Sequence, residues 1–150
     1  MKDSRVKTVE KLNNLLSGEY SASETYKQAL EKVQDDPKAS DLREIQSDHV
    51  MAIQLLKDEV RYLGGEPSRE SGLWGKWAQS VVGTAKIFGD KSAIKALQEG
   101  EEHGKKQYEE MLEPSNEIPP RVQELIKTTL LPQQEQHIRK LRSVMGEISS

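Results

Sequence analysis

The chain has 150 residues, a net charge of −3 and no cysteine, so it is long enough for one domain but has no disulfides, thiolate metal sites or thiol catalysis. With 34% hydrophobic residues and a mean hydropathy of −0.77, it can supply only narrow apolar stripes on amphipathic helices. Dispersed Lys and Arg disfavour nucleic-acid binding, and the lack of a long apolar run or signal-peptide core argues against a membrane, so we expect a bacterial-type cytoplasmic protein.

The first two predicted helices span residues 4–34 and 37–63 and form an antiparallel hairpin. Apolar residues recur at intervals of three and four along both segments, which is the helical period. Between them, Asp36 is expected to cap the second helix, with Pro37 at its first position. Gly64 and Gly65 mark where this helix ends.

A long connection over residues 64–90 follows, and we predict that it contains a short helix at 73–88. The segment carries Trp74, Trp77 and the only phenylalanine of the chain, which favours a crossover that covers part of the core over a disordered tether. The two tryptophans could also stack on a ligand, although packing is the more common use of such a pair.

The second pair of helices is predicted at residues 91–113 and 120–148. Asp90 can cap the first of them, and Glu113-Pro114 ends it. Inside the last helix, Pro132 removes one backbone hydrogen bond about a turn before His137, so we predict a kink there.

Six polar residues interrupt the apolar stripes and should therefore face one shared interior. They form two matching sets, which are Glu19 with Gln46 and His49, and Glu101 with Gln134 and His137. The surroundings match as well, because Gly18-Glu19 and Tyr26 recur with the same spacing as Gly100-Glu101 and Tyr108. The chain is thus predicted to be a duplicated helix pair in which each copy donates one Glu and one Gln-x-x-His.

This layout resembles that of the ferritin-like superfamily, in which a Glu on helices one and three and a Glu-x-x-His on helices two and four surround two metal ions. More closely, the chain resembles a little-studied bacterial ferritin-like family of unknown function. The points of likeness are the two Gly-Glu pairs, the segment from Glu59 to Pro67, the Gly89-Asp90-Lys91 turn, and the neighbourhood of His137, Ile138, Arg139 and Leu141. The resemblance implies an all-α, ferritin-like up-down four-helix bundle, with two antiparallel hairpins joined by a long crossover.

The departure from the di-metal pattern predicts one ion instead of two. Glu19 and Glu101 bring two negative charges, which balance one divalent ion but leave an excess of two positive charges with a pair. Gln46 and Gln134 stand where the pattern has Glu, and an amide oxygen cannot bridge two ions. We therefore expect a single Fe, Mn or Zn ion near Glu19, His49, Glu101 and His137, with the two glutamines as further donors, and no di-iron oxidase activity.

Other interpretations stay open from the residues alone. The two glutamates could pair with protonated histidines as a metal-free structural layer, the layer could hold another small ligand, or the histidines could respond to pH. The corresponding functions are metal handling or stress response, a non-catalytic interaction bundle, and pH-dependent regulation. Self-association into a homo-oligomer, such as a dimer, is expected in each case.

Several neighbouring side chains are expected to have less specific roles. His103 lies off the stripe and should be at the surface, and Asp48, Glu44 and Glu135 should be solvated. Tyr26 and Tyr108 are predicted to be core aromatics with satisfied hydroxyls.

Overall fold

The computed structural model describes residues 4–33, 36–69 and 91–147, and all regular structure in these ranges is helical. The long helices are α1 (Ser4–Lys32), α2 (Ala39–Tyr62), α4 (Lys91–Met111) and α6 (Leu131–Glu147), with a shorter α5 (Pro120–Leu125) before α6. A 3-10 turn at Pro114–Asn116 and a π-helical turn at Ile126–Leu130 complete the elements. The prediction of an all-α bundle is confirmed for this part of the chain. The expected crossover helix at 73–88, with Trp74 and Trp77, and the Asp90 cap lie outside the described residues.

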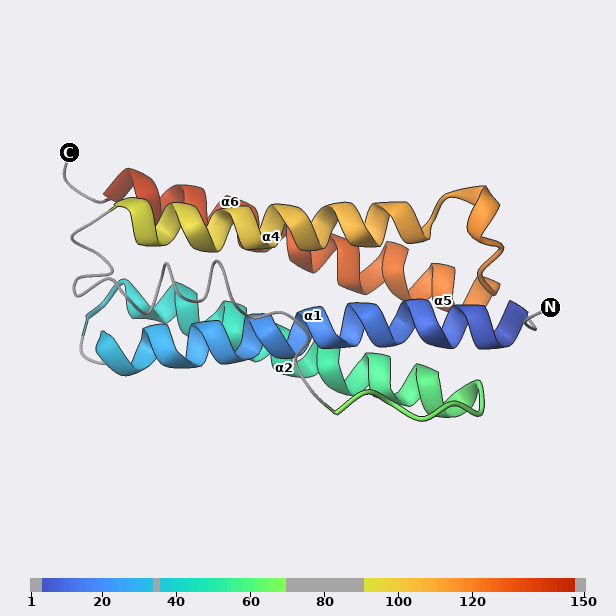
Figure 1. Ribbon diagram of the computed structural model, residues 1–150. Helices are drawn as coiled ribbons and strands as arrows, with labels where there is room; N and C mark the ends of the chain where they lie inside the picture. The colour runs from blue at the N-terminus through green and yellow to red at the C-terminus, as the bar shows by residue number, and fades with distance from the viewer. Residues whose placement is uncertain (1–3, 34–35, 70–90, 148–150) are drawn as a thin grey trace.

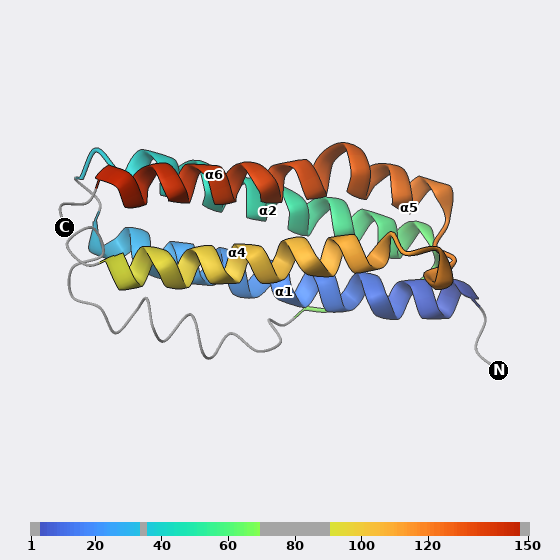
Figure 2. The same ribbon diagram turned by 90° about the horizontal axis from the view of Figure 1, so that it is seen from above.

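The helices form two antiparallel pairs that lie side by side along their whole length. In Figures 1 and 2, α1 pairs with α2, and α4 pairs with α6, as the contacts between these elements also indicate. Following the colours from blue to red, α2 and α4 run in the same direction, so the molecule is not a simple alternation of up and down helices. This arrangement brings all four long helices around one interior. No helix in the described ranges is both long enough and apolar enough to span a bilayer.

The ends of α2 follow local capping rules. The helix begins at Ala39, two residues later than predicted, because Asp36 and Pro37 form a preceding turn in which the Asp36 carboxylate accepts a hydrogen bond from the Lys38 amide at 2.9 Å. At the other end, Gly64 adopts a φ of 81°, and the Gly65 amide donates to the Val60 carbonyl at 2.9 Å. This is a Schellman ending, which requires a left-handed residue and favours glycine.

The predicted irregularity near Pro132 takes the form of a π-helical turn, Ile126–Leu130, which directly precedes α6. The Leu131 amide donates to the carbonyl of Ile126, five residues back, where an α-helix would use the fourth. Because Pro132 has no amide hydrogen and its ring would crowd the carbonyl four residues earlier, a regular α-helix is disfavoured here. The turn therefore lets α5 and α6 continue as one helical rod.

Two apolar clusters fill the bundle, one on each side of a polar layer. The cluster toward the α1–α2 turn contains Tyr26, Ala29, Leu42, Ile45, Ala93, Ile94, Ala96, Leu97, Leu141 and Val144. The cluster toward the α4–α5 connection contains Leu12, Leu15, Leu16, Ala52, Leu56, Val60, Tyr108, Met111, Ile118, Val122, Ile126 and Leu130. The polar layer thus lies near the middle of the bundle, with apolar packing on both sides along the bundle axis.

Candidate metal centre

The polar layer receives one ionisable side chain from each long helix. Glu19 comes from α1, His49 from α2, Glu101 from α4 and His137 from α6. Their exposed fractions are 6, 2, 0 and 2%, so the helical stripes place all four in the interior as predicted. Buried ionisable groups are stable only when they are paired, hydrogen-bonded or bound to a metal.

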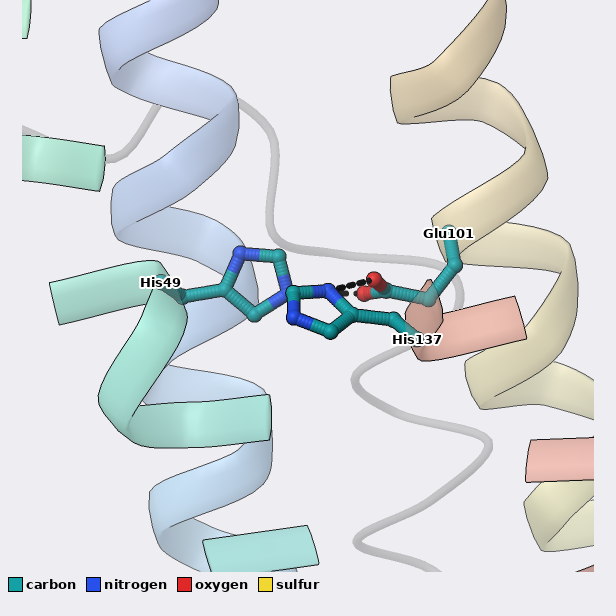
Figure 3. Close-up of side chains that lie close together, drawn as sticks. All are labelled: His49, Glu101 and His137. Carbon is teal, nitrogen blue, oxygen red and sulfur yellow. Dashed lines mark hydrogen bonds and ion pairs between the residues drawn. The ribbon is translucent and has the colours of Figure 1, made fainter. Parts of the chain in front are cut away.

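Glu101 lies at the centre of this layer because both histidines contact its carboxylate. The His49 Nε2 atom is 2.8 Å from Glu101 Oε2, and the His137 Nδ1 atom is 2.7 Å from Glu101 Oε1. Figure 3 shows the two imidazoles approaching the same carboxylate, with ring centroids 4.8 Å apart. One ligand atom from each of these three residues lies within 4.8 Å of the others. The structure therefore joins His49, Glu101 and His137 into one compact donor group.

A second carboxylate contacts the far nitrogen of each imidazole. His49 Nδ1 is 2.5 Å from Glu19 Oε2, and His137 Nε2 is 2.9 Å from Asp48 Oδ2. The assignment of Asp48 as a solvated charge was wrong, since its side chain is only 34% exposed and reaches across to α6. Asp48 directly precedes His49 in the sequence, which places it beside the buried stripe of α2, but the sequence alone does not show that its side chain contacts α6.

The two tyrosines of the repeat bind the carboxylates crosswise. Tyr26 on α1 donates its hydroxyl to Glu101 Oε2 on α4 at 3.2 Å, and Tyr108 on α4 donates to Glu19 Oε1 on α1 at 2.7 Å. The Tyr26 ring also stacks on His49, with centroids 5.5 Å apart. Both hydroxyls are thus satisfied as expected, but by the layer itself, so the tyrosines help to hold Glu19 and Glu101 in place.

The two glutamines occupy different positions from each other. Gln134 is buried and donates its amide to the Glu101 backbone carbonyl at 3.0 Å. Gln46 is half-buried and donates to the Ser23 hydroxyl at 3.3 Å. Gly104 allows the close approach of Gln134, because a Cβ there would lie 2.5 Å from the Gln134 Nε2 atom. Neither side-chain amide is hydrogen-bonded to the Glu101 carboxylate or to an imidazole of His49 or His137. A ligand role for the glutamines therefore stays a prediction.

Burial and nearby charges shift the pKa values of four groups of the layer, His49, Glu101, Tyr26 and Tyr108, when no ion is present. Burial lowers the pKa of His49, but the negative charges of Glu101 and Glu19 outweigh this effect and raise the pKa well above 6.5. Burial raises the pKa of Glu101, yet positive His49 and the hydrogen bonds from both histidines lower it to about 2. Burial and then the nearby carboxylates raise the pKa of Tyr26 and Tyr108 well above 10, so both hydroxyls stay protonated.

A cavity of about 420 Å³ adjoins the layer between α1 and α4. Glu19, His49 and Glu101 line it, together with small and polar residues of both helices. His103 is exposed, as predicted, but it also lies at the edge of this cavity. The buried donor group is therefore connected to a space large enough for several water molecules.

The donor group suits one divalent transition metal. Two imidazoles and a carboxylate are the ligands that Zn²⁺, Fe²⁺ and Mn²⁺ accept, and bonds of about 2.1 Å in a tetrahedral site separate the ligand atoms by about 3.4 Å. In such a site the distances from the histidine nitrogens to the Glu101 oxygens would lengthen by about 0.6–0.7 Å from 2.8 and 2.7 Å, and the three ligand atoms already lie within 4.8 Å of one another. With each near nitrogen on the ion, the far nitrogen would donate to Glu19 or Asp48, which is the usual support for a metal-bound histidine.

Comparison with known proteins places the chain in a family without assigning an activity. No curated protein and no solved structure matches the sequence. A family match covers residues 7–114, which includes Glu19, His49 and Glu101 and stops before α5 and α6. The chain therefore belongs to the protein family described as "Domain of unknown function (DUF2383)".

Proposed function

We propose that the protein binds a single divalent transition metal in the bundle interior, with His49, Glu101 and His137 as ligands, and that it acts in metal handling. The observation that supports this most is the convergence of two imidazoles on one buried carboxylate, with a further carboxylate behind each ring. An arrangement in which every ligand is also held by an outer partner is typical of metal sites. The likeness to ferritin-like proteins suggests the same class of function.

One ion is favoured over two because only Glu101 touches both histidines among the described residues. Glu19 contacts one histidine and a tyrosine, so it is better placed to orient His49 than to bridge a second ion. Oxygen activation by paired iron would need bridging carboxylates from both helical motifs, where this chain has Gln46 and Gln134. A role in stress response stays a prediction.

A metal-free structural layer is the second candidate, and a specific observation favours it. All four imidazole nitrogens face a carboxylate oxygen at hydrogen-bond distance, and no buried side-chain nitrogen or oxygen in the described ranges lacks a partner. Two imidazoles hydrogen-bonded between three carboxylates would be stable without an ion. Such a layer would fix the register of the four helices and leave function to the outer surface.

The two candidates are separated by elemental analysis and thermal unfolding of protein purified without a metal-affinity tag. If the metal proposal is correct, we expect about one Fe, Mn or Zn ion per chain, and Co²⁺ or Zn²⁺ should raise the unfolding midpoint of chelator-treated protein. A ligand at 100 times its Kd stabilises the native state by about 2.7 kcal/mol.

Glu101→Gln is the informative variant because it removes the carboxylate that both histidines share. It should abolish the midpoint shift. The matched control is Glu102→Gln, which removes the neighbouring, exposed charge and should retain full metal binding. A wild-type protein that neither contains nor binds metal would overturn the proposal and favour the structural layer.

A further inference from the structure

The repeated Gly-Glu pairs have a role beyond supplying carboxylates, because both glycines line the cavity next to the layer. Gly18 precedes Glu19 on α1, and Gly100 precedes Glu101 on α4. We propose that this cavity, hereafter the α1–α4 port, is the path by which a hydrated divalent cation reaches the buried donor group. The proposal rests on the metal-binding function proposed above and concerns how the ion gains access.

The charge of the port favours cations at its inner end. Glu19 and Glu101 form part of its floor, and both are almost completely buried. Asn14, Ser17 and Gln107 contribute neutral polar groups nearer the outside, and the described lining contains no Lys or Arg. At this inner end the negative charges of Glu19 and Glu101 outnumber the one positive charge of protonated His49, which also lines the port. Negative groups at the base of a poorly solvated recess raise the local concentration of cations.

The size of the port also fits a hydrated ion. Six waters occupy about 180 Å³ in the liquid, whereas the cavity measures about 420 Å³. A divalent cation can therefore enter with its inner hydration shell and exchange waters for protein ligands at the floor. From the opposite side, Asp48 closes the approach to His137 by binding its Nε2 atom. From the port, an ion first meets Glu19, His49 and Glu101, which line it.

The mouth of the port can be narrowed without touching a proposed ligand. Gly18 is exposed, and a Cβ at this position would lie 3.6 Å from the Gln107 Oε1 atom, which is an ordinary contact. A longer side chain at position 18 would thus extend toward α4 across the mouth. Gly18→Phe is the narrowing variant, Gly18→Ala is its small counterpart, and Gln107→Ala widens the mouth from the other helix.

Stopped-flow absorption with Co²⁺ measures the consequence, because Co²⁺ bound by nitrogen and oxygen ligands absorbs visible light. Association is followed after mixing with apoprotein, and dissociation is followed after adding excess chelator. Gly18→Phe should slow both rates by at least about tenfold and leave the Kd within about twofold, since a port changes the path and not the end states. Gln107→Ala should increase both rates. In the double variant Gly18→Phe/Gln107→Ala, the association and dissociation rates should be higher than in Gly18→Phe alone.

Gly146→Phe is the matched control, because a Cβ at Gly146 meets no atom within 4 Å and this residue lies near the end of α6. Unchanged rates in Gly18→Phe, or equal slowing in Gly146→Phe, would overturn the port while leaving the metal site intact. A weaker Kd in Gly18→Phe with no acceleration in Gln107→Ala would also overturn it. Absence of Co²⁺ binding by the wild-type protein would instead contradict the proposed function.

Discussion

At the scale of single residues, the layer is organised around Glu101, and its outer carboxylates have a different role. Glu101 contacts both imidazoles, whereas Glu19 and Asp48 each contact the far nitrogen of one. A carboxylate in such a position fixes the orientation of the ring and makes the other nitrogen a better donor. Removing an outer carboxylate should therefore weaken a metal site, while removing Glu101 should destroy it.

We predict that Glu19→Gln and Asp48→Asn each weaken Co²⁺ binding by about 10–100-fold without abolishing it. The amide oxygen can still accept the imidazole N–H, but it no longer carries the charge that polarises the ring. Titration of the visible Co²⁺ bands measures both affinity and ligand set, and the band positions should stay the same. Glu44→Gln, which alters an exposed carboxylate paired with Lys140, should have no effect. A loss of the bands in Glu19→Gln would make Glu19 a direct ligand.

The metal-free layer should make stability depend on pH on both sides of a window. His49 faces Glu19 from α1, Glu101 from α4 and His137 from α6, with Tyr26 stacked on its ring. The pKa of His49 is raised on folding. Its contribution to the free energy of unfolding is therefore complete below pH 6.5 and is lost as the pH rises through the pKa of the folded state. The pKa of Glu101 is lowered, so its contribution is complete above pH 4.5 and is lost as pH falls toward about 2.

Chelator-treated protein should accordingly be most stable between pH 4.5 and 6.5, as measured by urea unfolding midpoints across a pH series. His103→Gln provides the control, because His103 is exposed and contributes no comparable interaction within the layer. Its pH curve should coincide with that of the wild type. Midpoints that do not change from this window into the alkaline range would contradict the role assigned to His49.

At the scale of elements, the π-helical turn shows which part of the fold the sequence could predict. Pro132 predicted an irregularity, but not its type. The additional signal is the spacing of four residues between Val122, Ile126, Leu130 and Gln134, which are all buried. In a regular α-helix, the twelve residue steps from Val122 to Gln134 would rotate the side-chain direction by about 120° about the helix axis. The one additional residue in the π-turn removes about 100° of this rotation, so the four side chains stay on one face. Only the core packing on both sides shows that the stripe must stay aligned.

The Schellman ending of α2 yields a prediction that separates backbone conformation from packing. Gly64 has a φ of 81° and no atom within 4 Å of an added Cβ, so Gly64→Ala is opposed by backbone conformation alone. It should lower the free energy of unfolding by about 1–2 kcal/mol. Gly18→Ala, inside α1 and with room for a methyl group, should raise it by up to about 1 kcal/mol. Urea unfolding tests both, and changes of the same sign would contradict this explanation.

At the scale of the whole molecule, the polar layer and the two apolar clusters form one interior. The helical period was sufficient to predict the four helices and the burial of Glu19, His49, Glu101 and His137, because each lies on its own apolar stripe. It could not predict which atoms meet, since that depends on the rotation of four helices about one another. Asp48 was missed for this reason, as were the crosswise bonds of Tyr26 and Tyr108. Self-association stays a prediction, for which sedimentation analysis is the test.

The shared interior predicts a single cooperative unfolding transition. Leu56 and Ile94 are fully buried in the clusters on opposite sides of the layer, and replacing either with Ala should cost about 2–5 kcal/mol. Far-UV circular dichroism, which follows the helices, and near-UV signals from the buried tyrosines should change at the same denaturant concentration in each variant. Separate transitions would show that the two clusters unfold independently.

The unequal roles of the two glutamates also bear on the internal duplication that the sequence predicts. Glu101 serves two histidines and Glu19 serves one, while the residue before His137 is Gln136, where the first copy has Asp48 before His49. The two predicted copies are thus not interchangeable at this position. Asp48→Gln, which places the residue of the second predicted copy in the first, would remove the carboxylate behind His137. A substitution in one half of the chain therefore affects the polar layer differently from the matching substitution in the other half, although both halves pack around the same interior.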